Sequence, residues 1–181
     1  MIEIDFEHKI LVLGGAASGK SRYAERLIEA YCHKTDEIAE YLATLPRDLA
    51  AADTEMETKV LKHRARRDQG LWHLTEEPLD IYPHILRKTS EPLLVDCLTL
   101  WLNNLLAAGR NPWDEFLRLE DSLWHSIRRV VLVSNELGLG LVPAEAESRQ
   151  FRELQGELNQ IAAEYCDRVV LVVAGQPLVV R

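Results

Sequence analysis

The sequence has few cysteines and no long hydrophobic run, and these two absences exclude whole classes of protein. Among its 181 residues only Cys32, Cys97 and Cys166 are cysteines. They are scattered, odd in number and form no C-x-x-C pair, so neither a disulfide framework nor a zinc site is indicated. We expect each to be a small buried apolar residue rather than a nucleophile. No apolar stretch reaches the ~20 residues that a membrane-spanning helix needs.

An excess of positive charge is also lacking. The chain has 21 Lys and Arg residues against 29 Asp and Glu residues, which gives a formal net charge of −8. A broad nucleic-acid-binding face is therefore not expected, although a local basic pocket is not excluded. Residues 1–5 show no signal-peptide pattern, so the cytoplasm is the expected location. Repeats and low-complexity tracts are missing, and the length suits one domain spanning residues 1–181.

Short apolar runs alternate with amphipathic stretches, which predicts the α/β class with a mainly parallel sheet flanked by helices. We expect strands at 9–14, 38–43, 92–96, 129–134 and 168–174. We expect helices at 20–32, 54–67, 79–88, 98–108, 113–126 and 147–165, with a loop at 45–53. The carboxyl ends of parallel strands gather ligand-binding loops. Since Gly14, Thr44, Asp96 and Asn135–Glu136 each follow such an end, one shared site is predicted there.

The most informative motif, G-x-x-x-x-G-K-S, lies between the first predicted strand and the first predicted helix. It consists of Gly14, Gly15, Ala16, Ala17, Ser18, Gly19, Lys20 and Ser21. In this context several backbone N–H groups surround one point, as in the phosphate-binding loop (P-loop) of nucleotide-binding proteins. Gly14 and Gly19 let the backbone approach phosphate oxygens without an intervening Cβ. Lys20 is expected to reach the β- and γ-phosphates, and the Ser21 hydroxyl is expected to bind Mg²⁺.

Asp96 ends the apolar run 93–95, which is the position of the Walker B carboxylate. There it would help to hold Mg²⁺, directly or through water. The alternative is that Asp96 caps the helix predicted at 98–108. We favour the metal-side role because the residue lies at a strand end.

His63 lies in a basic stretch of an otherwise acidic protein. The surrounding cations are Lys59, Lys62, Arg64, Arg66 and Arg67. Such a cluster attracts a triphosphate, and like charge favours the neutral imidazole that a nucleophile requires. The alternative is a solvated helix face with a surface histidine. Farther along, Arg149 and Arg152 share a helix face, where they either bind phosphate or pair with nearby glutamates.

Taken together, these motifs resemble the bifunctional adenosylcobinamide kinase/adenosylcobinamide-phosphate guanylyltransferase family of cobalamin biosynthesis. The resemblance covers residues 9–173. Its most specific parts are two strings in this order and spacing: D-C-L-T-L-W-L-x-N-L-L from Asp96, and S-N-E-x-G-x-G-x-V-P from Ser134. The P-loop alone occurs in many families.

The resemblance implies a two-step enzyme that assembles as a homotrimer. First, ATP or GTP phosphorylates adenosylcobinamide. A histidine then attacks the α-phosphate of GTP, and the resulting covalent GMP passes to adenosylcobinamide phosphate. The position that matches the nucleophile is His63, with Lys20 as the second catalytic residue. The implied GTP-contacting positions are residues 14–21, Ala43, Thr44, Leu45, Arg64, Ala65, Arg66, Arg67, Glu76 and Asp96.

A few positions depart from the family pattern. Ala17 stands where arginine is usual, Asp68 stands where proline is usual, and Ala174–Gly175 replaces serine–glycine. Two other interpretations stay open: a P-loop kinase for another small metabolite without nucleotidyl transfer, and a non-catalytic GTP-binding regulatory subunit. The presence of Lys20, Asp96 and His63 argues against the regulatory subunit.

Overall fold

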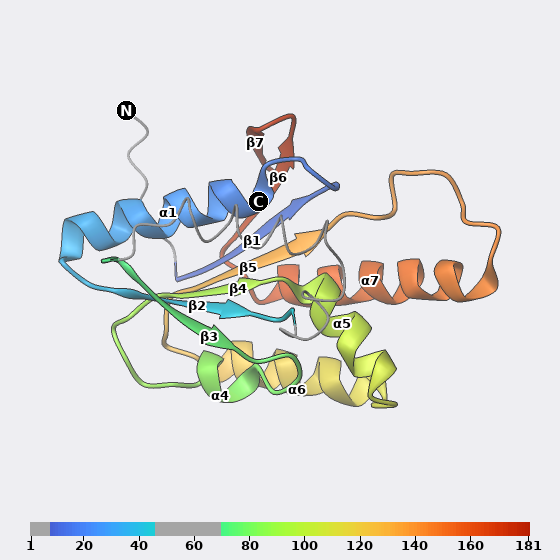
Figure 1. Ribbon diagram of the computed structural model, residues 1–181, viewed down its shortest axis with the longest axis horizontal. Coiled ribbons are helices and arrows are strands. Elements are labelled where there is room, and N and C mark those ends of the chain that lie inside the picture. Colours follow the sequence, from blue (N-terminus) through green and yellow to red (C-terminus); the bar gives the residue numbers. More distant parts are fainter. Residues whose placement is uncertain (1–7, 46–69) are drawn as a thin grey trace.

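The structure is a computed structural model that describes residues 8–45 and 70–181. In this part of the chain a seven-stranded sheet forms the centre (Figure 1). In sheet order its strands are β3 (Trp72–Glu76), β2 (Ala39–Ala43), β4 (Leu93–Asp96), β5 (Val130–Asn135), β1 (Lys9–Gly14), β6 (Arg168–Val173) and β7 (Gln176–Val179). All neighbours are parallel except β6 and β7, which form an antiparallel hairpin. The predicted α/β class with a mainly parallel sheet is confirmed.

Helices cover both faces of this sheet. They are α1 (Lys20–Thr35), α4 (Tyr82–Ile85), α5 (Leu98–Ala107), α6 (Pro112–His125) and α7 (Ala146–Glu164). Helix α1 lies on one face and the others lie on the opposite face (Figure 1). Successive β1 side chains point to opposite faces of the sheet. Ile10 and Val12 pack in the hydrophobic core beneath α1, and Leu11 packs in the core on the opposite face. Because both faces are buried, the central strands are almost uninterrupted apolar runs, which makes them recognisable in the sequence.

Three elements differ from the sequence prediction. β3 and β7 were not expected, and the helix expected at 79–88 contains only the four residues of α4. Glu77 explains part of that shortening, since its carboxylate accepts hydrogen bonds from the backbone N–H groups of Leu79 and Asp80, each at 2.9 Å, and so forms a turn there. The helix expected at 54–67 lies outside the described residues, as does the expected loop except for Leu45.

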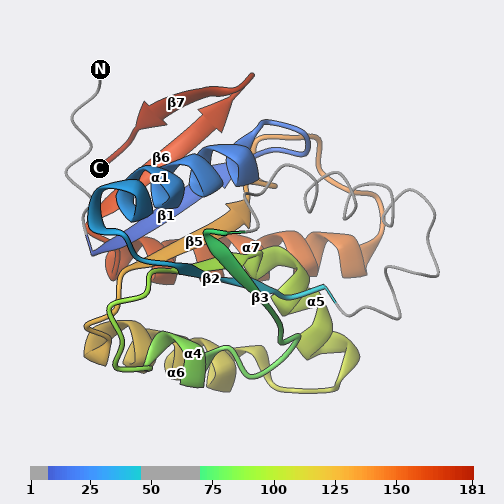
Figure 2. The same ribbon diagram turned by 60° about the vertical axis from the view of Figure 1, so that its left-hand side comes forward.

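The sequence did not predict β3 and β7, and the reason is the same for both strands. Both lie at the edges of the sheet, where polar residues are tolerated. β7 also contains Pro177, a residue that sheets accept at an edge because it cannot donate to a second neighbouring strand. In Figure 2 the β6–β7 hairpin stands at one end of the sheet. Neither edge strand therefore shows the long apolar run of the central strands.

The three cysteines are free and buried, as expected. Burial raises the pKa of Cys32 and Cys97 to about 11 and that of Cys166 to about 12, which makes the reactive thiolate scarce at neutral pH. Within the described residues no helix combines the length and the apolar character needed to cross a membrane.

A buried ionic cluster joins β2 to the segments around it. Arg128 and Glu40 are both fully buried, with 2.8 Å between Arg128 Nη1 and Glu40 Oε2. His84 Nδ1 lies 2.7 Å from the other Glu40 oxygen, and Arg87 lies 3.1 Å from Oε2. Burial alone would raise the pKa of Glu40, but the hydrogen bonds from His84 and Arg128 outweigh it and lower the pKa to about 2. The cluster therefore stabilises the fold only while Glu40 is ionised.

We predict that Glu40→Gln lowers the free energy of unfolding at pH 7 by about 3–5 kcal/mol, because Arg128 then stays buried without its counter-charge. The folded-state pKa of Glu40 lies below its ordinary value of 4.5. Its contribution is complete above that value and is lost as the pH falls toward 2. Urea unfolding should therefore show that the difference in the free energy of unfolding between wild type and Glu40→Gln becomes smaller as the pH falls from 4.5 toward 2.

The matched control is Asp80→Asn, which removes a partly exposed partner of Arg110 at the surface. This change should cost less than about 1 kcal/mol. An equal loss of stability in the two variants would contradict the assigned role of the buried cluster.

Candidate functional site

The carboxyl ends of the parallel strands bring the predicted site residues to one edge of the sheet. Ala43 is in register with Glu76 of β3 on one side and with Asp96 of β4 on the other. Gly14 is in register with Asn135 of β5. The turn after β1 and the loop after β5 leave the sheet at the same end (Figure 1). The prediction that these strand ends meet is confirmed.

The G-x-x-x-x-G-K-S motif forms the turn from β1 into α1. Gly19 has a φ of 95°, in the left-handed region that suits glycine, and Ala17 has a φ of 56°. In the part of the chain that the structure describes, no side chain caps the start of α1, and its first turn has no acidic residue. The first amide N–H groups of this 16-residue helix are thus left to an anion, which the helix dipole also favours.

Gly14 is needed for close packing. A Cβ built on it would lie 2.7 Å from the backbone carbonyl oxygen of Val172 in β6 and would also clash with the Ser18 side chain. Gly15 is different, since no described atom comes within 4 Å of the corresponding Cβ position. The sequence suggested that Gly14 serves phosphate approach, whereas the geometry adds a packing requirement against the neighbouring strand.

The β6–β7 turn supports the P-loop from the side. Ala174 and Gly175 both have positive φ, as in a two-residue type I′ hairpin turn. The Gly175 N–H donates to the Ser18 carbonyl at 2.8 Å. Sequence reasoning noted Ala174–Gly175 only as a departure from a family pattern. Because the contact crosses from one end of the chain to the other, no local pattern indicated this support.

Three polar side chains gather at the start of α1 and the end of β4. Ser21 Oγ lies 3.4 Å from Asp96 Oδ1, and the Tyr41 hydroxyl donates to Asp96 Oδ2 at 2.5 Å. The cap position of α5 is Cys97 and has no side-chain cap, so the alternative role of Asp96 as a helix cap is excluded. The carboxylate faces the P-loop, as the Walker B interpretation requires.

Lys20 is partly buried, and its Nζ donates to the Gly15 carbonyl at 3.1 Å. Burial lowers the pKa of Lys20 from its ordinary value, and Cys97 and Asp96 oppose that shift by less. Ser18 Oγ is also buried here, and within the described part of the chain it has no hydrogen-bond partner. A phosphate group would supply acceptors to both side chains and would restore the solvation that Lys20 has lost.

The oxygen donors at this place fit Mg²⁺, which prefers carboxylate, hydroxyl and phosphate oxygens. Ser21 and Asp96 are the residues that would hold it. Among the described residues there is no cluster of three or more His, Cys, Asp or Glu side chains suited to a metal. A bound cation would therefore depend on phosphate and water oxygens to complete its shell, as is usual for magnesium in nucleotide sites.

Thr44 joins the ends of β2 and β4. Its buried Oγ1 donates to the Cys97 carbonyl at 2.8 Å and accepts from the Cys97 N–H at 2.9 Å. Asn104 of α5 in turn donates to the Thr44 carbonyl at 2.6 Å. The Thr44 hydroxyl is thus engaged by backbone, while Ala43 and Leu45 on either side are half-buried at the strand end.

The loop after β5 is tied to the P-loop and to two helices. The Glu136 N–H donates to the Gly14 carbonyl at 3.1 Å, and the Asn135 N–H donates to Thr99 Oγ1 at 2.9 Å. Asn159 of α7 donates to the Asn135 carbonyl at 3.0 Å. The sequence assigned no role at the site to Thr99 or Asn159. Their roles appear once α5 and α7 are packed against β5.

Arg149 and Arg152 have a role that neither sequence interpretation included. Arg149 donates to the carbonyls of Pro143 and Ala144, at 3.1 and 2.5 Å. Arg152 donates to carbonyls of the same loop, with the shortest bond at 2.9 Å to Leu141. Both guanidinium groups therefore hold the loop after β5 by its backbone.

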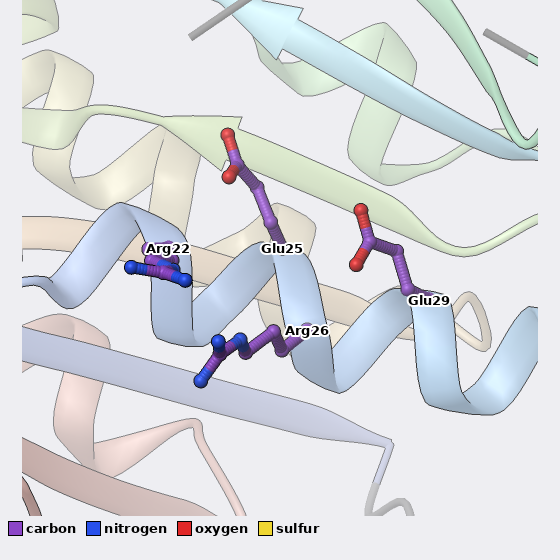
Figure 3. Close-up of a pocket in the computed structure, with 4 residues that line it drawn as sticks. All are labelled: Arg22, Glu25, Arg26 and Glu29. Atoms are coloured by element: carbon purple, nitrogen blue, oxygen red, sulfur yellow. The ribbon is translucent and has the colours of Figure 1, made fainter. Parts of the chain in front are cut away.

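A pocket lies along α1 after the P-loop and is lined by Arg22, Glu25, Arg26 and Glu29. In Figure 3 Glu25 and Glu29 extend from the same side of the helix, and Arg26 extends from another. Glu29 accepts a hydrogen bond from Trp72 Nε1 at 3.3 Å. No P-loop residue lines this pocket.

The other predicted site residues, His63, Arg64, Ala65, Arg66 and Arg67, lie outside the described residues. Glu76 is described and is exposed at the end of β3. The structure thus brings together the part of the predicted site that is expected to bind phosphate. This part consists of the G-x-x-x-x-G-K-S motif, Asp96 and the neighbouring strand ends.

A parallel sheet, a glycine-rich turn into a helix, and a lysine, a serine and a strand-end aspartate together define a P-loop NTPase-like domain. The chain belongs to the family described as cobinamide kinase / cobinamide phosphate guanyltransferase, which matches residues 10–180.

Two relatives illustrate this membership. The chain is 43% identical over 178 residues to the bifunctional adenosylcobalamin biosynthesis protein CobP of Pseudomonas aeruginosa, covering 93% of this chain and 94% of that one. It is 34% identical over 184 residues to the bifunctional adenosylcobalamin biosynthesis protein CobU of Escherichia coli K12, covering 92% and 96%. Among solved structures, flagellar accessory protein FlaH of Methanocaldococcus jannaschii aligns with a TM-score of 0.50, covering 97% of this chain and 80% of that one. At 13% identity this last likeness concerns the fold alone.

We predict that Gly14→Ala weakens nucleotide binding and lowers stability by about 1–3 kcal/mol, because the new methyl group forces β1, β6 and the P-loop apart. Gly15→Ala is the matched control, since its methyl group would enter open space. Titration with a fluorescent GTP analogue and thermal unfolding would measure both effects. Equal behaviour of the two variants would show that the close packing at Gly14 is not required.

Proposed function

We propose that this protein phosphorylates adenosylcobinamide and then transfers GMP from GTP to adenosylcobinamide phosphate, within cobalamin biosynthesis. The observation that carries the proposal is the P-loop with Lys20, Ser21 and Asp96 in a chain whose family is described by both activities. The names of the two relatives support the pathway, and the P-loop supports the use of a nucleoside triphosphate.

In the kinase step the substrate hydroxyl oxygen attacks the γ-phosphorus of ATP or GTP. The bond from that phosphorus to the β,γ-bridging oxygen breaks, and the hydroxyl proton is released. Lys20 and the amide N–H groups at the start of α1 would stabilise the charge on the phosphate oxygens. Bound Mg²⁺ would add positive charge at the same oxygens, held by Ser21 and Asp96.

In the guanylyl-transfer step His63 acts as the nucleophile, as the family resemblance implies. A neutral imidazole nitrogen attacks the α-phosphorus of GTP, a P–N bond forms, and pyrophosphate leaves. A phosphate oxygen of adenosylcobinamide phosphate then attacks the same phosphorus, and the P–N bond breaks. The arginines at 64, 66 and 67 are proposed to offset charge on the phosphoryl oxygens during both displacements.

The resemblance also leads us to propose a cytoplasmic homotrimer. Sedimentation equilibrium measures the assembly directly, and a mass equal to that of one chain would contradict it. The proposal does not require contact with nucleic acid, in line with the net charge of −8.

For the covalent step we predict that wild-type protein incubated with Mg²⁺ and α-³²P-GTP carries a label through denaturing electrophoresis. The label should be labile to acid and stable to alkali, because a phosphoramidate links it to histidine, and it should be absent from His63→Ala. His33→Ala, at an exposed position on α1, is the control and should be labelled like wild type. A γ-³²P-GTP parallel should leave the protein unlabelled, since pyrophosphate leaves.

An unlabelled wild type that still binds GTP would overturn the covalent step. Phosphorylation of adenosylcobinamide, or of another small metabolite, would then favour a simple kinase. GTP binding without any turnover would favour a regulatory subunit.

A further inference from the structure

Tyr41 directly contacts the carboxylate of Asp96, the candidate Mg²⁺ ligand, and the sequence assigned it no role at the site. The residue lies within β2 and is 4% exposed, and its hydroxyl donates to Asp96 Oδ2 at 2.5 Å. The other oxygen of the same carboxylate, Oδ1, is the one that lies near Ser21 Oγ. The two Asp96 oxygens are therefore divided between a buried phenol and the P-loop serine.

The phenol itself is held in place by its neighbours. Trp72 of β3 packs its ring edge-on against Tyr41, with the ring centroids 5.8 Å apart and an interplanar angle of 74°. Trp72 Nε1 in turn donates to Glu29 Oε1 at 3.3 Å. Glu29 lies on α1, the helix that begins at the P-loop, and Figure 3 shows its carboxylate extending from that helix. A continuous set of contacts thus runs from α1 through two strands to Asp96.

A carboxylate on a strand end can turn about its last side-chain torsion, which has a broad energy profile. A charge-assisted hydrogen bond to one oxygen restricts that rotation and keeps the other oxygen in one direction. In metal sites such outer partners orient the ligand, and their loss typically lowers metal affinity about 10–100-fold.

We propose that Tyr41 is a positioning residue for magnesium: it binds Asp96 Oδ2 so that Oδ1 faces Ser21 and the phosphate end of the bound nucleotide. This inference rests on the proposed function, since it requires a metal–nucleotide complex at the P-loop. Tyr41 acts through Asp96 and touches neither substrate nor metal.

If Tyr41 had a purely structural role, its loss would not weaken metal binding selectively. Tyr82 provides a matched control for this comparison. Tyr82 is also 4% exposed, and its hydroxyl likewise donates to a carboxylate, that of Glu115. Tyr82 belongs to the core on the opposite face of the sheet from the core that contains Tyr41. Tyr82→Phe therefore removes a buried phenol–carboxylate bond without touching the P-loop.

The test uses Mn²⁺ as the metal probe on the full chain with bound GTP. Electron paramagnetic resonance of free Mn²⁺ gives its affinity for the complex, and a fluorescent GTP analogue in EDTA gives the metal-free nucleotide affinity. We expect Tyr41→Phe to weaken Mn²⁺ binding at least about 10-fold, while metal-free nucleotide affinity stays within about two-fold of wild type. Tyr82→Phe should leave both affinities unchanged, and Asp96→Asn is the reference for loss of the ligand itself.

Equal Mn²⁺ affinity in Tyr41→Phe and Tyr82→Phe, with a loss in Asp96→Asn, would overturn the role of Tyr41 and leave the proposed function intact. A parallel loss of metal-free nucleotide affinity in Tyr41→Phe would assign the residue to structure and would also overturn the proposal. A wild type that binds neither GTP nor Mn²⁺–GTP would overturn the proposed function together with this inference. Thermal unfolding of each variant shows that the compared proteins are folded.

Discussion

The parallel register of β2, β4, β5 and β1 is the constraint on which the site depends. Parallel strands end at the same edge, so the residues that follow them are brought together whatever their distance in the chain. Ala43 and Asp96 are in register across β2 and β4, and Gly14 and Asn135 are in register across β1 and β5. A shift of one residue in β4 would turn Asp96 to the other face of the sheet, away from Ser21 and Tyr41.

Hydrogen bonds to backbone atoms then secure the loops that leave this edge. Thr44 links the β2 and β4 ends, Glu136 links the β5 loop to Gly14, and Gly175 links the β6–β7 turn to Ser18. The polar side chains involved contact mostly backbone, and so their own hydrogen-bonding groups are satisfied without ligand. The P-loop differs: within residues 8–45 and 70–181, Ser18 Oγ is buried without a partner and Lys20 Nζ donates only to the nearby Gly15 carbonyl. The Ser18 hydroxyl and the Lys20 ammonium can therefore both donate to an anion bound at the start of α1.

Glu40 shows that a buried charge is not by itself a sign of a catalytic site. It is more deeply buried than Asp96 and has a strongly lowered pKa, yet its carboxylate is already paired with Arg128 and Arg87 and contacts His84. Asp96 instead contacts two neutral hydroxyl groups, those of Ser21 and Tyr41. The carboxylate of Asp96, in contact with hydroxyl groups rather than with guanidinium groups, can therefore accept a metal ion as a further partner.

Sequence reasoning identified the central strands and the P-loop because their signals are local. A strand buried on both faces is a continuous apolar run, and a phosphate-binding turn needs its glycines, lysine and serine next to one another. The same reasoning missed β3 and β7, since edge strands tolerate polar residues and proline. It also misjudged the 79–88 segment, where Glu77 forms a turn in place of the first part of a helix.

The sequence by itself determined the fold class, the P-loop and the strand-end position of Asp96, because these depend on residues that are neighbours in the chain. The tertiary structure decided which partner each polar group has. Tyr41 and Asp96 are 55 residues apart, and Ser21 and Asp96 are 75 residues apart. Only strand pairing and the packing of α1 on the sheet bring these groups within hydrogen-bonding distance, because a short-range polar contact requires a backbone geometry that no local pattern specifies.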